Sequence, residues 1–88
     1  MKLKCEFVLR EVVGEMIAIP VGEAAVGFNG MICLNPVGEV IFRGLQAAQT
    51  RDEILETILE RYDVSREEAL EDLDAFLRGL KEKGLLED

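Results

Sequence analysis

The chain opens with alternating apolar and polar positions that predict two paired strands. Residues 7–13 and 16–21 are rich in β-branched side chains, which is typical of β-strands. Gly14 and Glu15 separate them and predict a two-residue turn, with glycine at the position where a type II′ hairpin needs a positive φ. Pro20 cannot donate a ladder hydrogen bond, so we expect it near the end of its strand or on an open edge. These positions together predict an antiparallel hairpin.

A glycine-bearing loop and a short third strand follow the hairpin. Residues 22–30 contain three glycines and an asparagine, which favour loop conformations. Residues 30–34 then predict a strand that passes directly into a helix. Strand alternation places Ile32 and Leu34 on one face of this strand and Met31 and Cys33 on the other.

From residue 35 onward the pattern changes to helices, each with its own start signal. Asn35 stands before Pro36, a favourable N-cap followed by a proline at the first helical position. Thr50 and Ser65 each have a glutamate three residues later, which is the pattern of a capping box. Apolar side chains recur at helical spacing behind each cap, and Gly84 is expected to follow the end of the third helix.

This order of elements predicts an α+β fold. We expect a three-stranded antiparallel sheet followed by a three-helix bundle, similar to a winged helix-turn-helix with its strands placed first. The chain has 88 residues, so residues 1–88 are expected to form a single domain with one modest core.

The charge distribution disfavours binding to nucleic acid. The net charge is −8, and residues 35–88 carry seven basic and fourteen acidic side chains. The would-be recognition helix concentrates acidic residues in its first half, which would bring unpaired carboxylates toward phosphates. A winged-helix transcription module is therefore kept as an alternative that the electrostatics oppose.

The arrangement of apolar and charged residues argues against a membrane span and against a signal peptide. No apolar run reaches the roughly 18 residues of a membrane span. Glu6, Arg10 and Glu11 interrupt the apolar core that a signal peptide would need near the N-terminus. We therefore expect a cytoplasmic protein that binds no membrane.

The sequence also lacks the groups that most catalytic and metal sites use. It contains no histidine, and its two cysteines, Cys5 and Cys33, match no zinc or redox spacing. No nucleophile has a base beside it, and acidic pairs such as Glu67 and Glu71 are typical of a solvated helix face. We expect no enzyme activity from this chain by itself, no cofactor and no metal.

The third strand is the most informative element for function. If it forms a sheet edge, its unpaired N–H and C=O groups are a template for an added strand from a peptide. Two alternatives stay open: strands of the same chain cover this edge, or a second copy pairs with it in a homodimeric scaffold.

Four stretches, in this order and spacing, resemble a known family. They are residues 28–38, 50–62, 63–69 and 76–86, and together they resemble pyrroloquinoline quinone synthesis protein D (PqqD) and the related RiPP recognition elements. The resemblance covers nearly the whole chain. Pro36 departs from it, because the family more often has an acidic residue there.

The resemblance implies a non-catalytic protein that binds the leader segment of a ribosomally synthesised precursor peptide. In this family the leader adds as a strand to the third strand, in a groove closed by the third helix. The implied partners are the precursor peptide and a modifying enzyme, commonly a radical S-adenosylmethionine enzyme.

The expected peptide-binding residues come from the third strand and the third helix. The strand supplies main-chain pairing along Met31, Ile32, Cys33 and Leu34. On the helix, Leu73 centres the apolar arc that faces the core, and one flank of that arc is expected to line the groove. That flank consists of Ala69, Asp72, Phe76 and Gly79. We expect Phe76 to offer apolar surface and Asp72 to meet a basic leader residue, although ordinary core packing and a solvated face are the alternative readings of these two.

Overall fold

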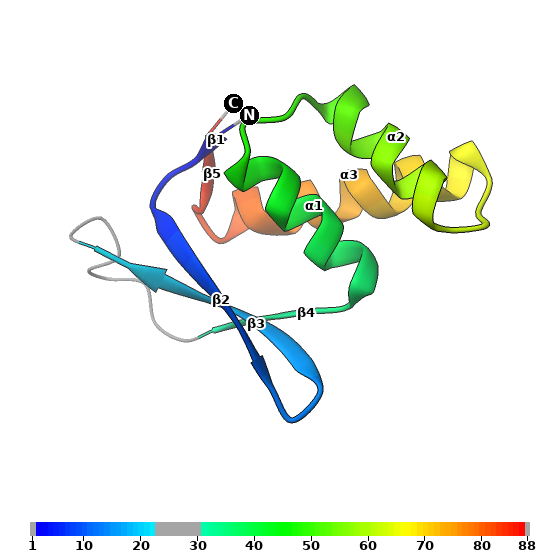
Figure 1. The fold of residues 1–88 in the computed structure, drawn as a ribbon. Coiled ribbons are helices and arrows are strands. Elements are labelled where there is room, and N and C mark those ends of the chain that lie inside the picture. The colour runs from blue at the N-terminus through cyan, green and yellow to red at the C-terminus, as the bar shows by residue number, and fades with distance from the viewer. Residues whose placement is uncertain (1, 23–30, 88) are drawn as a thin grey trace.

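The computed structural model describes residues 2–22 and 31–87 (Figure 1). Its arrangement is the predicted α+β fold, with a three-stranded antiparallel sheet followed by three helices. The elements, in chain order, are β1 (Lys2–Leu3), β2 (Glu6–Val12), β3 (Glu15–Val21), β4 (Ile32–Leu34), α1 (Pro36–Gln46), α2 (Arg51–Arg61), α3 (Arg66–Glu82) and β5 (Leu86–Glu87).

The main sheet has the strand order β2-β3-β4. β2 and β3 pair over seven residues each, and β4 adds to the far side of β3 with Ile17 opposite Cys33. The third strand is shorter than the predicted 30–34, because Met31 lies outside the ladder and Gly30 lies outside the described residues. The predicted loop 22–30 begins with Gly22 at a φ of 89°, and residues 23–30 lie outside the described part.

The hairpin turn lies one residue earlier than the sequence predicts. Its central residues are Val13 and Gly14, with φ values of 49° and 78°, so the turn is type I′ rather than type II′. The predicted turn would have placed Phe7 opposite Gly22, whereas the observed register places it opposite Pro20. The sequence places Val13 in the first strand and Gly14 at the first turn position, where a type II′ turn needs a positive φ. In the observed turn Val13 is left-handed, which costs a β-branched residue about 1–2 kcal/mol. Pairing along the whole hairpin outweighs that local cost.

The three helix starts are where the caps predict them. The Asn35 side chain accepts a hydrogen bond from the backbone N–H of Gly38 at 2.7 Å, and Thr50 forms both bonds of its capping box. Ser65 accepts from the backbone N–H of Glu68 at 3.1 Å. The second bond of this capping box, from the Ser65 backbone N–H to the Glu68 carboxylate, is missing from the hydrogen bonds of the described residues. The Glu68 carboxylate is exposed, so water can satisfy it instead.

The end of α3 returns the chain to its beginning. Gly84 has a φ of 74°, and the Gly84 and Leu85 N–H groups bond to the carbonyls of Lys81 and Leu80, which is a Schellman motif. The turn buries Leu85 and Leu86, and β5 then pairs with β1 in a two-stranded sheet. This second sheet was not among the elements expected from the sequence, because its strands are two residues long and far apart in the chain.

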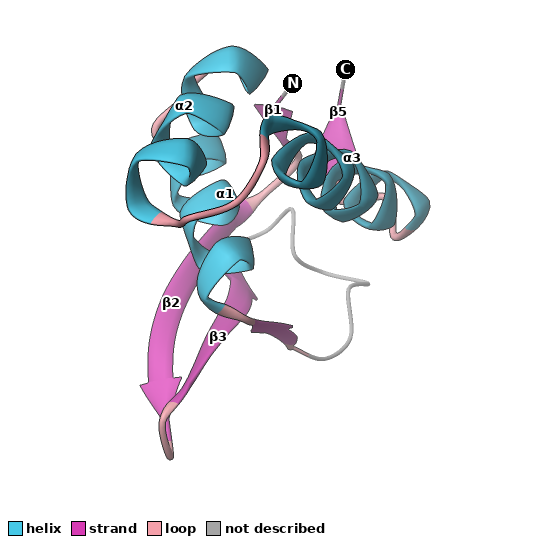
Figure 2. Ribbon diagram, turned by 90° about the vertical axis from the view of Figure 1, so that its right-hand side faces the viewer, coloured by secondary structure: helices cyan, strands magenta, loops and turns pink. Residues whose placement is uncertain are grey.

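The core lies between the main sheet and the helices, which gather on one side of that sheet (Figure 2). Ala18 on the central strand and Phe42 on α1 are fully buried. Gly44 allows the close crossing of α1 and α2, because an added Cβ would lie 2.6 Å from Ile54 Cγ1. Across residues 2–22 and 31–87, no helix is both long and apolar enough to cross a membrane.

Candidate functional site

The open margin of β4 is the first part of the candidate site. β4 pairs with β3 on one side, and no strand among residues 2–22 and 31–87 pairs with its other side. An edge of this kind presents unpaired backbone groups that can accept a further strand.

The hairpin register shows which backbone groups of β4 point outward. A type I′ turn closes on a hydrogen-bonded pair, here Val12 and Glu15. Bonded and non-bonded pairs alternate from there, so Ile17 directs its N–H and C=O toward β2. Cys33, which lies opposite Ile17 on the other side, therefore directs its own N–H and C=O away from the sheet.

Two features of β2 and β3 agree with this alternation. It predicts that the Phe7 carbonyl points away from β3, and that carbonyl accepts a hydrogen bond from Gln46 Nε2 at 3.1 Å. It also makes Phe7 and Pro20 a non-bonded pair, where the missing N–H of proline costs no ladder bond. Both features therefore support the alternation from which the outward direction of the Cys33 backbone follows.

A hollow of about 360 Å³ lies at the C-terminal end of β4, between the start of α1 and the middle of α3. The Phe76 ring lies against α1 because Gly38 has no side chain; a Cβ there would lie 3.1 Å from Phe76 Cε2. Asp72, one turn before Phe76, places an exposed carboxylate at the same hollow. Its lining residues are Asn35, Val37, Gly38, Ile41, Asp72, Ala75 and Phe76.

The predicted strand residues have the expected alternation. The Met31 side chain is 62% exposed and Cys33 is also exposed. Leu34 is buried in the core, and Ile32 is half-buried against it. The strand therefore has one face toward the core and one toward solvent.

The predicted helix residues divide into two groups. Asp72 and Phe76 meet at the hollow, whereas Ala69 and Leu73 are fully buried core residues whose side chains no ligand can reach without repacking. The helical arc is wider than the sequence analysis assumed, so Ala69 belongs to the buried stripe rather than to its flank. Gly79 is half-buried, and the space where its Cβ would lie is open, but Gly79 does not line the hollow.

Sequence reasoning missed the contribution of α1 to the hollow. Val37 and Gly38 lie in the first turn of α1 and complete the wall opposite Phe76. Gly38 carried a usable signal, because a glycine inside a helix is unfavourable unless another group approaches closely. No groups of acidic residues and cysteines suited to a metal ion occur within the described ranges.

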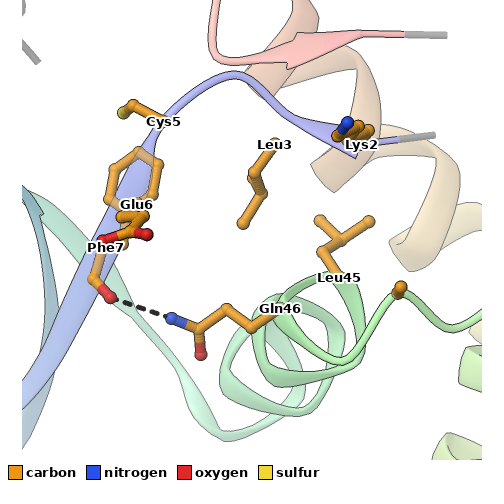
Figure 3. A pocket seen from close by; sticks show the side chains of 8 residues that line it. Lys2, Leu3, Cys5, Glu6, Phe7, Leu45 and Gln46 are labelled. Carbon is orange, nitrogen blue, oxygen red and sulfur yellow. Dashed lines mark hydrogen bonds between the residues drawn. The ribbon is translucent and has the colours of Figure 1, made fainter. Parts of the chain in front are cut away.

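The opposite edge of the sheet differs from the β4 edge (Figure 3). Gln46 from the end of α1 reaches across to the Phe7 carbonyl and occupies one outward group of β2. A second hollow of about 370 Å³ lies here, beside Cys5, whose thiol pKa is raised by burial. The residues lining it are Lys2, Leu3, Cys5, Glu6, Phe7, Leu45, Gln46 and Ala48. A side chain of the protein thus partly closes the β2 edge.

Comparison with known proteins places this arrangement in a family. The model of the family described as Coenzyme PQQ synthesis protein D (PqqD) matches residues 11–86. The chain belongs to the PqqD family. The match includes most of the hairpin, β4 and all three helices, which are the elements that form the candidate site.

A solved structure shares the fold over nearly the full length of both chains. It is described as TbiB1 in complex with the TbiA(beta) leader peptide, and its chain is 29% identical to this one with a TM-score of 0.79. The alignment covers 99% of this chain and 95% of the other. A search of curated proteins found no significant match.

Proposed function

We propose that this chain is a non-catalytic peptide-binding protein that holds the leader segment of a ribosomally synthesised precursor peptide. The leader adds as a strand to β4, and alternate side chains enter the hollow between α1 and α3. Membership of the PqqD family supports this proposal, as does the similar fold of TbiB1, which was solved with a leader peptide.

The observation that carries the proposal is the open backbone of Cys33 beside the hollow. The register turns the Cys33 N–H and C=O away from β3, and no strand of residues 2–22 and 31–87 pairs with them, so we propose that they bond to an incoming strand. Leu34 leads directly into Asn35, which lines the hollow together with Asp72 and Phe76, and we therefore place side chains of the added strand near these residues. Main-chain bonds supply affinity, and the apolar ring with its neighbouring carboxylate supplies selectivity.

The bound leader would bring the rest of the precursor to a modifying enzyme. In this role the chain contributes binding energy and proximity, and the chemistry belongs to the partner. The partner we propose is a peptide-modifying enzyme, commonly a radical S-adenosylmethionine enzyme in systems of this type. Micromolar affinity for the leader requires about −8 kcal/mol, which a few main-chain bonds and side-chain contacts can provide.

A titration followed by NMR tests the proposal. The probe is the leader of a precursor peptide encoded beside this gene, added to 15N-labelled protein, with a scrambled peptide of equal composition as control. We expect the largest amide shifts at Cys33 and around Phe76, and smaller ones along β2. Absence of binding, or shifts confined to the β2 edge, would contradict the proposal.

A homodimer that joins two β4 edges would use the same backbone groups. Light scattering across a concentration series distinguishes the two, because self-pairing predicts a dimer that dissociates when peptide is added. A dimer that persists with saturating peptide would show that its interface lies elsewhere.

A further inference from the structure

The main sheet has a second, solvent-facing surface that the helices do not cover. We call it the outer face; the strand register places on it the side chains of Glu6, Val8, Arg10, Val12, Glu15, Ile17, Ile19, Val21, Met31 and Cys33. The strand register defines it, because Arg10, Ile17 and Cys33 lie directly opposite one another across the three strands. Ile17 is 8% exposed yet does not belong to the core cluster, which agrees with its position on this face.

Apolar side chains on the outer face extend from Val8 on β2 to the open margin of the sheet, although Arg10 also lies on this face. Val8 is 40% exposed on β2, and Ile19 is half-buried beside it on β3. At the margin itself, Cys33 is exposed and Met31 is 62% exposed. Exposed apolar side chains therefore lie beside the margin of β4 that no strand of the described residues pairs with.

Strand geometry decides what can occupy this margin. Residues directly opposite on adjacent strands place their side chains on the same face of the sheet, whichever way the added strand runs. A peptide residue opposite Cys33 must therefore point to the outer face, and its two neighbours must point to the side of the sheet that faces the helices, where the hollow lies between α1 and α3. An added strand cannot bind the hollow without also placing side chains beside Cys33.

We propose that Cys33 and Met31 form a second specificity surface for the leader, which selects an apolar side chain at the leader position opposite Cys33. This inference rests on the proposed function, and it specifies the peptide as one with apolar side chains on both faces. The small Cys33 side chain leaves room for a larger partner, and Met31 adapts its shape to it. Continuity with the open backbone favours the leader over any separate occupant of the outer face.

The inference predicts how an added charge changes specificity. Cross-strand pairs of opposite charge are favourable, and pairing a charge with an apolar side chain loses the apolar contact. In Cys33→Asp the preferred leader residue opposite position 33 should change from apolar to lysine or arginine. In Cys33→Lys it should change to aspartate or glutamate.

A display library of random 12-residue peptides is selected for binding to the immobilised full chain. The same selection is repeated on Cys33→Asp and on Cys33→Lys. For one peptide selected on the unmodified protein, Cys33→Asp should weaken binding about two- to fivefold. A lysine at the responsive position should restore most of that loss. Val12→Asp is the matched control, because Val12 is 47% exposed on the outer face but lies on β2; it should leave the selected sequences unchanged. Thermal melts confirm that each variant is folded.

A parity rule makes the test independent of any assumed register. The peptide position that responds to Cys33 points to the outer face, whereas the position that responds to Asp72→Lys points to the hollow. The position numbers of these two peptide residues must therefore differ by an odd number, as those of adjacent residues do. An even difference would overturn the inference.

The remaining outcomes separate this inference from the proposed function. Selection of the same peptides by Cys33→Asp as by the unmodified protein would overturn the inference and leave the proposed function standing. Failure of the unmodified protein to enrich any peptide family would overturn both. A change in oligomeric state with Cys33→Asp, without a change in selected peptides, would assign the margin to self-association and would also overturn the inference.

Discussion

Val13 has an unfavourable backbone conformation in the hairpin turn. Its φ is 49° and its side chain is 97% exposed, so no packing offsets the strain locally. Asparagine followed by glycine is the preferred pair for a type I′ turn. Val13→Asn should therefore stabilise the protein by about 1 kcal/mol, which corresponds to a rise of roughly 4–8 °C in Tm.

Thermal unfolding followed by circular dichroism measures this effect. Val12→Asn is the matched control, because Val12 lies one residue earlier, in β2, where asparagine is disfavoured. Equal stabilisation by both variants would show that the gain comes from removing an exposed valine rather than from relief of the turn.

Asp72 is the charged residue at the hollow whose role in binding can be tested by charge reversal. Its carboxylate is exposed, so replacement should leave stability within about 0.5 kcal/mol. Asp72→Lys should weaken binding of a leader with a basic residue at that position about fivefold, and less at high salt. Fluorescence anisotropy with a labelled leader measures the change.

Glu71→Lys provides the control for Asp72→Lys. Glu71 is the exposed neighbour of Asp72 and does not line the hollow, so its reversal makes the same change in net charge. If both variants weakened binding equally, the cause would be the overall electrostatic field of the protein rather than an ion pair between Asp72 and the leader in the hollow.

At the scale of the element, neighbouring residues of β4 direct their backbone N–H groups to opposite sides of the strand. The Cys33 N–H points outward, whereas the Ile32 N–H points to Ala18 on β3. Proline removes one N–H at either position. Cys33→Pro should therefore reduce leader affinity about tenfold or more with little loss of stability, because the missing N–H belongs to the open margin.

Ile32→Pro tests the same geometry in the opposite sense. It removes a ladder hydrogen bond and leaves a carbonyl of β3 without its partner, so it should cost about 1–3 kcal/mol of stability. Denaturant unfolding and leader titration on both variants distinguish the two effects. Unfolding by Cys33→Pro would show that its N–H points inward and would remove the basis of strand addition.

At the scale of the whole molecule, net charge decides between two functions of a similar fold. A winged helix bound to DNA needs cations near phosphates, and this chain has a net charge of −8 with its negative charge concentrated in the helical part. We expect no mobility shift of genomic DNA fragments at low salt, where binding would be strongest. A shift that sharpens as salt is lowered would contradict this expectation.

The sequence determined the features that depend on a few neighbouring residues. Asn35, Thr50 and Ser65 start the helices and Gly84 ends the last one, because these caps are local hydrogen bonds between residues three to five positions apart. The alternation of Met31, exposed, and Leu34, buried, is also local, since it follows from the two-residue period of a strand.

The tertiary structure decided the features that join distant parts of the chain. Hairpin register overrode the local preference against a left-handed Val13, and β1 paired with β5 across the whole sequence. The hollow exists because Gly38 on α1 leaves room for the Phe76 ring from α3, and helix packing buries Ala69, which was expected on the flank of the apolar arc. Such contacts depend on how helices and strands pack, which the period of a single element does not specify.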